Sequence, residues 1–178
     1  WLNTTYNGVN GYTPFSEEEL DGVTGNQTYK RLIQALQIEL NTQYNAGISV
    51  DGSFGNGTLN AIPATISKNT SVNNITFIIQ GSLWCKGYSA GVLDGIFDSA
   101  VESAVKKFQT DAGITADGRI RPYILQGIMN TDGYAYRGSE GTNKYYKHLV
   151  QLGMNANYGA QIGLTAPNGL WERKSHKN

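Results

Sequence analysis

The sequence has very little of what disulfides and metal sites need. One of its 178 residues is cysteine, Cys85, so neither an internal disulfide nor a cysteine cage for a metal is possible. The two histidines, His148 and His176, lie far apart and among basic residues, which argues against a structural zinc site. We therefore expect no bound metal and no cofactor.

The chain also lacks an excess of charge and any long apolar run. Fourteen Lys and Arg balance fourteen Asp and Glu, so nothing in the charge indicates attraction to nucleic acid or to an anionic membrane. No apolar run approaches the about eighteen residues that cross a bilayer. Uncharged polar residues and eleven tyrosines take the place of charge. Such surfaces are common where a protein meets carbohydrate or peptide polymers.

What the sequence does contain is a repeated Asp-Gly phrase. It is DGSFGNGTLNAI from Asp51 and DGIFDSAVESAVKKFQ from Asp94. Further Asp-Gly pairs begin at residues 21, 117 and 132. Gly takes a positive φ at no steric cost and Asp accepts backbone N–H bonds, so the pair suits a tight turn. We expect the residue two after the Gly, such as Phe54 or Phe97, to enter the core, and a polar residue near it to cap a helix.

Four of the Asp-Gly pairs predict an all-α fold with two small three-helix bundles in tandem. Unit A covers residues 1–66 and unit B residues 74–136, each in the order helix, loop, helix, loop, helix. The 73 residues from Gly22 to Gly95 set the unit length, and each long helix is expected after the first Asp-Gly pair of its unit. Apolar side chains recur at helical spacing in RLIQALQIEL and SAVESAVKKFQ. The polar stretch 67–73 between the units is predicted to be a linker.

Residues 137–178 are predicted to form a partial third unit or a docking segment. Asn155 and Tyr158 match Asn3 and Tyr6, in the same order as at the start of the chain. The first helix of unit A is expected to be truncated, so that both ends resemble cuts in a longer array.

Unit B carries a specific resemblance. The stretch DGIFDSAVESAVKKFQTDAGITADG closely resembles the peptidoglycan-binding domain of bacterial wall hydrolases, a three-helix module. The residues that match its pattern are Gln80, Leu83, Gly87-Tyr88, Asp94-Gly95, Phe97, Ala104-Val105, Phe108-Gln109, Gly113-Ile114 and Asp117-Gly118. Unit B departs at Asp98 and Val101, where the family usually has Gly and Thr, and unit A has one extra residue before Leu36-Gln37. Finer details resemble multi-repeat wall proteins of Gram-positive bacteria, in which such modules accompany a glycoside-hydrolase-like domain.

The resemblance implies an extracellular, wall-associated protein with a shallow groove on each unit. Such a groove would bind the stem peptide or glycan of peptidoglycan, and tandem copies would raise a weak affinity. We expect the loops before the central helices to line it, with Tyr29 and Tyr88 exposed. The candidate ligand-binding residues are Asn26, Thr28, Tyr29, Asn56, Thr58, Tyr88 and Ser99.

No arrangement of residues predicts catalysis. Asp94, Asp98 and Glu102 are spaced by four, but the first belongs to a turn and the second lies where a helix cap is needed. There is no nucleophile-elbow sequence and no phosphate-binding loop. We therefore expect a non-catalytic wall-binding module that anchors an attached hydrolase. The alternative is a structural protein whose last segment completes the next copy, giving a head-to-tail extracellular polymer.

Overall fold

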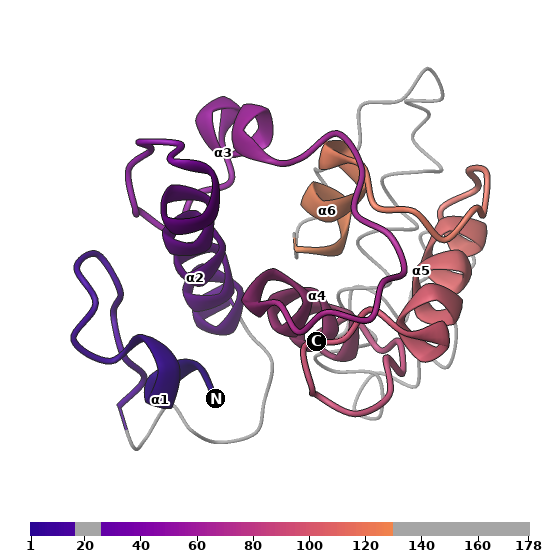
Figure 1. The fold of residues 1–178 in the computed structure, drawn as a ribbon, viewed down its shortest axis with the longest axis horizontal. Helices are drawn as coiled ribbons and strands as arrows, with labels where there is room; N and C mark the ends of the chain where they lie inside the picture. Colours follow the sequence, from indigo (N-terminus) through magenta and orange to yellow (C-terminus); the bar gives the residue numbers. More distant parts are fainter. Residues whose placement is uncertain (17–25, 130–178) are drawn as a thin grey trace, which may run out of the picture.

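The computed structural model describes residues 1–16 and 26–129, so the third unit expected at 137–178 lies outside the described residues. The described part is helical and contains no β-strand, which confirms the all-α class for it (Figure 1). Its helices are α1 (Leu2–Tyr6), α2 (Asn26–Tyr44), α3 (Asn56–Ala61), α4 (Asn74–Cys85), α5 (Ser99–Asp111) and α6 (Pro122–Ile128).

Helix α5 shows how local sequence sets the helix ends. Asp98 is its N-cap, and the Asp98 carboxylate accepts hydrogen bonds from the backbone N–H groups of Ala100 and Val101 at 3.0 and 3.1 Å. The buried side of α5 carries Val101, Val105 and Phe108. The expected cap and apolar face are thus confirmed. α3 has Gly55 at its N-cap instead, without a side-chain bond.

The two halves of the chain share one hydrophobic core. α2 and α4 make the most extensive contact between helices, and they lie next to each other in Figure 1. One cluster of buried side chains runs from Leu36 of α2 through Ile78 of α4 to Phe108 of α5. Buried residues lie on most sides of α4, so this helix packs against both halves at once. The described residues therefore do not form the two separate bundles that the repeat predicts.

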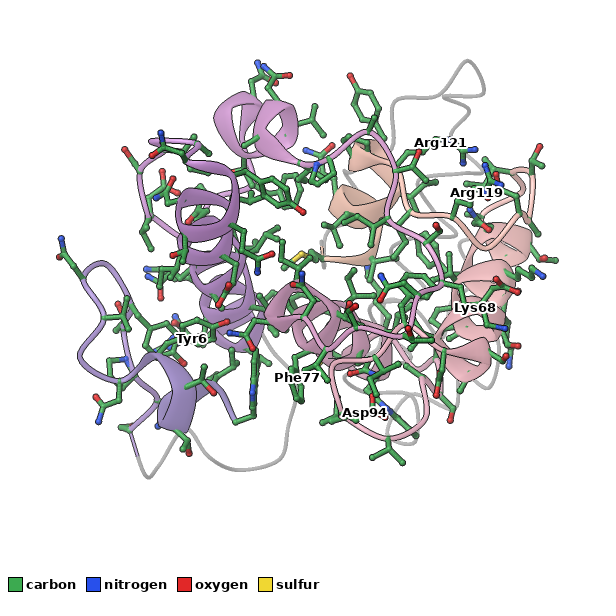
Figure 2. All side chains as sticks on the ribbon, viewed as in Figure 1. Tyr6, Lys68, Phe77, Asp94, Arg119 and Arg121 are labelled. Atoms are coloured by element: carbon green, nitrogen blue, oxygen red, sulfur yellow. The ribbon has the colours of Figure 1, made fainter. Side chains whose placement is uncertain are left out.

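The N-terminal segment packs onto the same core. The Trp1 ring stacks on Phe77 of α4, with 4.8 Å between ring centroids. The buried hydroxyl of Tyr6 donates to the Glu39 carboxylate of α2 at 2.8 Å. Figure 2 shows Tyr6, the last residue of α1, between α1 and α2, and Phe77 beside α4. α1 is therefore part of this packed body.

Each described Asp-Gly turn is held by a buried glutamine, an arrangement that we call a glutamine clamp. In the clamp at Asp94-Gly95, which is the second of the three described along the chain, the Gln80 Nε2 donates to Asp94 Oδ1 at 3.0 Å. The Gly95 N–H donates back to Gln80 Oε1 at 3.0 Å. The same bonds recur in two further clamps, Gln37 with Asp51-Gly52 and Gln109 with Asp117-Gly118. The three glycines all have φ near +75° (+75°, +75° and +74°), as the turn requires.

The clamps correct the expected length of the repeat. Gln37 precedes Asp51 by 14 residues, and Gln80 precedes Asp94 by the same 14. α2 therefore corresponds to α4, and each residue lies 43 positions before its counterpart rather than 73. The expected spacing of 73 residues pairs α2 with α5, because both of these helices are long. That pairing is wrong, since the counterpart of α5 is the short α3.

The stretch expected as a linker lies against the second half. Just before it, Ile66 exchanges two backbone hydrogen bonds with Ile120, at 2.7 and 2.8 Å. Within it, the Asn69 N–H donates to the carbonyl of Phe97 at 3.0 Å, and the Asn73 N–H donates to that of Gly95 at 2.9 Å. Most side chains of residues 67–73 face solvent, the apolar Val72 among them, while the backbone at Asn69 and Asn73 is fixed to unit B.

Candidate functional site

A groove of about 400 Å³ lies between the end of α5 and the start of α6. The loop after α5, which carries the last described Asp-Gly turn, forms one wall. The lining residues are Gln109, Ile114, Thr115, Asp117, Arg121, Tyr123 and Ile124.

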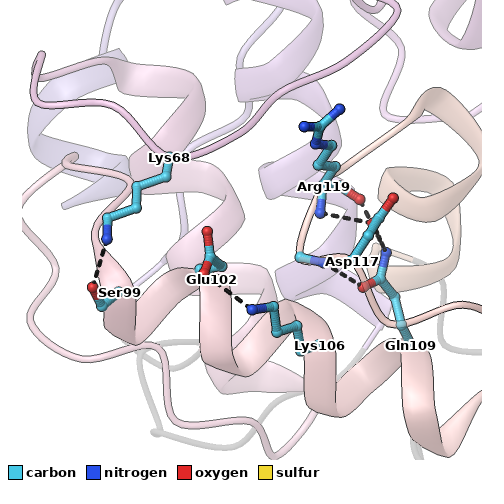
Figure 3. A network of polar contacts seen from close by, with 8 residues as sticks. Lys68, Ser99, Glu102, Lys106, Gln109, Asp117 and Arg119 are labelled. Atoms are coloured by element: carbon cyan, nitrogen blue, oxygen red, sulfur yellow. Dashed lines mark hydrogen bonds and ion pairs between the residues drawn. The ribbon is translucent and has the colours of Figure 1, made fainter.

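The third glutamine clamp fixes the shape of this groove. The fully buried Gln109 donates to Asp117 Oδ1 at 3.1 Å and to the carbonyl of Arg119 at 3.0 Å. The Gly118 N–H donates back to Gln109 Oε1 at 2.9 Å. Figure 3 shows Gln109, Asp117 and Arg119 joined by these bonds at the end of α5. The loop is thus pre-organised, and its side chains have fixed starting points.

The groove combines opposite charges with an aromatic ring. Arg121 Nη2 lies 2.7 Å from Asp117 Oδ2, and both side chains are partly exposed. The Arg121 guanidinium beside it holds the pKa of the Asp117 carboxyl well below its usual range. Tyr123, the second residue of α6, is 41% exposed. Together with the apolar Ile114 and Ile124, these groups suit a ligand that carries both charged and apolar parts.

A row of polar contacts continues along α5 away from the groove. Lys68 Nζ donates to Ser99 Oγ at 2.8 Å, and Lys106 Nζ lies 3.2 Å from Glu102 Oε1. Figure 3 shows both contacts on the side of α5 that also carries Gln109. Ser99, a candidate residue from the sequence, is exposed at the start of this row.

Three candidate residues from the sequence are buried instead of exposed. Tyr29 and Tyr88 are 3% and 2% exposed, so the expectation that they lie on the surface is wrong. The Tyr88 hydroxyl donates to the Asp111 carboxylate at 2.7 Å, and the ring packs edge-on against Phe108. Thr58 is also buried, where its hydroxyl accepts a bond from Gln37 at 3.1 Å. The rings or polar atoms of these residues are part of the buried core, and the spacing of apolar residues in the sequence does not reveal this.

The other candidates lie apart from one another. Asn56 is the exposed first residue of α3, and Thr28 lines an apolar cavity of about 250 Å³ beside Trp1 and Phe77. Asn26 is the first residue of α2, and its side chain lies outside the described part. The described lining of the groove includes none of the seven candidates. Its residues flank the Asp-Gly pair at 117 on both sides, so that pair is the signal in the sequence that points to them.

The acidic residues considered for catalysis have other tasks. Asp98 caps α5 and Glu102 pairs with Lys106. The Asp94 carboxyl has a lowered pKa because it accepts hydrogen bonds from the Gln80 side chain and the Ile96 N–H. Within residues 1–16 and 26–129, no three His, Cys, Asp or Glu side chains gather to hold a metal. None of the helices described there is long and apolar enough to cross a bilayer.

A family comparison bears directly on the helices around the groove. Residues 76–122 match the model of the family described as "Putative peptidoglycan binding domain". A peptidoglycan-binding domain occupies residues 76–122. It contains most of α4, all of α5 and the loop that carries Asp117 and Arg121. The groove therefore opens at the end of this domain, where α6 begins.

Two curated proteins of Bacillus subtilis (strain 168) are similar to the chain beyond the peptidoglycan-binding domain. The uncharacterized protein YbfG is 35% identical over 181 residues, which are 99% of this chain and 23% of YbfG. The uncharacterized protein FadG is 34% identical over 184 residues, which are 100% of this chain and 30% of FadG. The chain thus spans less than a third of either relative. No solved structure gives a significant match.

Proposed function

We propose that this chain is a non-catalytic module that binds bacterial peptidoglycan and anchors an attached hydrolase domain to the wall. The observation that carries the proposal is the position of the groove, which is built on the peptidoglycan-binding domain at residues 76–122. Among the described residues outside this domain, α2 supports it, because α2 packs on α4 and shares its core.

The chemistry of the groove fits a stem peptide. Such a peptide carries carboxylates, and depending on the organism a free amine, along a short apolar backbone. Arg121 is placed to bind a carboxylate and Asp117 an ammonium, while Tyr123 offers an aromatic face. One groove of this size gives weak binding, which repeated modules in a longer protein would raise through effective concentration. The proposed location is the extracellular face of a Gram-positive cell wall.

Cosedimentation with purified, protein-free sacculi tests this function. The chain is expected to sediment with the sacculi, and Arg121→Ala to weaken binding by about ten- to a hundredfold, since a charge-assisted hydrogen bond contributes about 1.5–3 kcal/mol. Arg119→Ala is the matched control, because Arg119 is exposed on the same loop and does not line the groove. A chain that stays in the supernatant would refute wall binding. Equal losses for the two variants would refute the assignment of the groove.

The same preparation tests the two remaining parts of the proposal. Dye-labelled sacculi incubated with the chain alone are expected to release no soluble dye, and steady release would show that the chain is itself a hydrolase. Light scattering of the purified chain is expected to give a monomer. A concentration-dependent polymer without affinity for sacculi would favour the alternative of head-to-tail assembly.

A further inference from the structure

A second pocket, of about 240 Å³, lies outside the peptidoglycan-binding groove. It is formed where the end of α2, the stretch after α3 and the start of α4 meet. The lining residues are Tyr44, Pro63, Thr65, Ile66, Ser67, Lys68, Asn69, Asn73, Ile75 and Thr76. Most of them lie before residue 76, outside the range of the family match.

The rim of this pocket carries an exposed aromatic ring. Tyr44 is the last residue of α2 and is 51% exposed. Pro63 lies on the same pocket and is half-buried. The tyrosine ring and the proline thus give the lining of this pocket apolar surface, on which the C–H groups of a sugar ring can pack while its hydroxyls point outward.

Polar groups that accept and donate neutral hydrogen bonds surround this face. Thr65 and Ser67 are exposed, and within the described part of the chain their hydroxyls have no hydrogen-bond partner. The Asn69 Oδ1 accepts from the Ser71 N–H at 2.9 Å, which orients its amide nitrogen. These hydroxyl and amide groups match the hydroxyls and acetamido groups of an amino-sugar chain.

The pocket is held rigidly before any ligand arrives. Asn73 and Gln43 exchange two side-chain amide bonds of 2.9 and 3.0 Å, which tie the start of α4 to the end of α2. The backbone bonds of Ile66 and Asn69 fix the opposite wall to unit B. A rigid site loses less entropy on binding, which matters for a weak saccharide ligand.

The charges of the two sites differ. The described lining of this pocket contains no carboxylate, and its one cation, Lys68, donates to Ser99. The groove by α6 instead carries the Asp117–Arg121 pair. A peptide with a free amine therefore finds no partner in the pocket, whereas an uncharged saccharide leaves no charge without a partner.

We propose that this pocket binds the glycan strand of peptidoglycan through its N-acetylated amino sugars, while the groove by α6 binds the peptide. This inference rests on the proposed wall-binding function and adds a second contact with the same polymer. Two weak sites on one rigid body would then engage neighbouring parts of one wall fragment. Ser99, which bonds Lys68 at the edge of the pocket, is the candidate from the sequence that lies beside it.

A matched pair of tyrosine variants tests the inference. The intact chain, Tyr44→Ala and Tyr123→Ala are each titrated, by NMR or calorimetry, with chitotetraose, with peptide-free glycan strands and with a soluble stem peptide. Tyr44→Ala is expected to weaken binding of the saccharides by about two- to tenfold, through the loss of an aromatic contact. It is expected to leave peptide binding unchanged. Tyr123→Ala is expected to do the reverse, and both tyrosines are exposed enough for the variants to fold.

The outcomes separate this inference from the function on which it rests. Sedimentation with sacculi together with an absence of binding to both saccharides would overturn the glycan site and leave wall binding intact. Saccharide binding that Tyr44→Ala does not weaken would also overturn it. If the chain binds neither sacculi nor any soluble ligand, both proposals fail. Asn69→Ala is a second, independent variant, which is expected to weaken binding of the saccharides and to leave binding of the stem peptide unchanged.

Discussion

The glutamine clamp at Gln80 allows a demanding prediction of stability. Gln80 is fully buried, and its Nε2 donates to the carbonyl of Val92 and the carboxylate of Asp94, both at 3.0 Å. Its Oε1 accepts the buried N–H of Gly95 at 3.0 Å. Gln80→Ala removes all of these bonds at once and leaves the Gly95 N–H buried without its acceptor.

The expected loss follows from the groups that stay behind. A buried N–H without an acceptor costs about 1–3 kcal/mol. The vacated side-chain volume costs about 1 kcal/mol more in lost packing. Gln80→Ala is therefore expected to destabilise the protein by about 3 kcal/mol, which for a chain of this length corresponds to a fall in melting temperature of about 10 °C. Gln37→Ala and Gln109→Ala are expected to destabilise the protein by similar amounts, because each glutamine holds its own Asp-Gly turn by the same kind of hydrogen bond.

Urea denaturation followed by circular dichroism measures these losses. Gln126→Ala is the control, because Gln126 is partly buried and makes one long bond, 3.3 Å, to the carbonyl of Phe54. Its cost is expected to stay below about 1 kcal/mol. Should Gln80→Ala cost no more than Gln126→Ala, the clamp would not stabilise the turn, and the repeated Asp-Gly phrase would need another structural explanation.

Three further predictions concern single residues of the same core. Gly95 has φ +75°, and a Cβ there would lie 2.5 Å from the Phe77 ring, so Gly95→Ala is expected to destabilise by more than the about 1–2 kcal/mol of a left-handed backbone alone, as thermal melting can measure. Asp98→Ala is expected to cost about 1 kcal/mol and Asp98→Gly only a few tenths of that, and equal costs in urea denaturation would contradict the cap. Burial raises the pKa of Tyr12 to about 12 and that of Tyr88 well above its ordinary value of 10.0. Above pH 10.0 the folded state keeps the protons of these two hydroxyls while the unfolded state releases them. The stability that the two tyrosines contribute is therefore complete below pH 10.0 and is lost as the pH rises above it. A urea midpoint that stays constant from pH 9 to about pH 11.5 would contradict this.

The motif residues of unit B were the most predictable part of the fold. Asp98 caps its helix, and Phe97 and Ile120, each two residues after the glycine of an Asp-Gly pair, are fully buried. These features are local, since a turn, a cap and the first helical residues lie within one short stretch of sequence. The helical face of α5 followed from its apolar spacing for the same reason.

The shared core and the binding surfaces were not predictable in the same way. The packing of α2 on α4 joins residues that are far apart in the sequence, and no local pattern records it. The sequence predicts Tyr29 and Tyr88 on the surface near the polar candidates, yet an amphipathic side chain is also buried when its ring fills a core position. Arg121 and Tyr123 form the groove only because the start of α6 lies next to the end of α5 and the loop that follows it, and tertiary packing sets this arrangement.

The helix that follows the glutamine clamp is short in the first half and long in the second, and a proline explains the difference in length. In the second half the clamp leads into α5, which has 13 residues and closes the core. In the first half the matching helix, α3, has 6 residues, because Ile62 precedes Pro63 and a residue before proline avoids the helical conformation. The chain then leaves α3 and crosses to unit B beside the exposed Tyr44. A longer α3 would carry residues 63–69 elsewhere, so the shortened repeat is what creates the second pocket. Pro63→Ala should therefore weaken saccharide binding in the same titrations while leaving the groove by α6 unaffected.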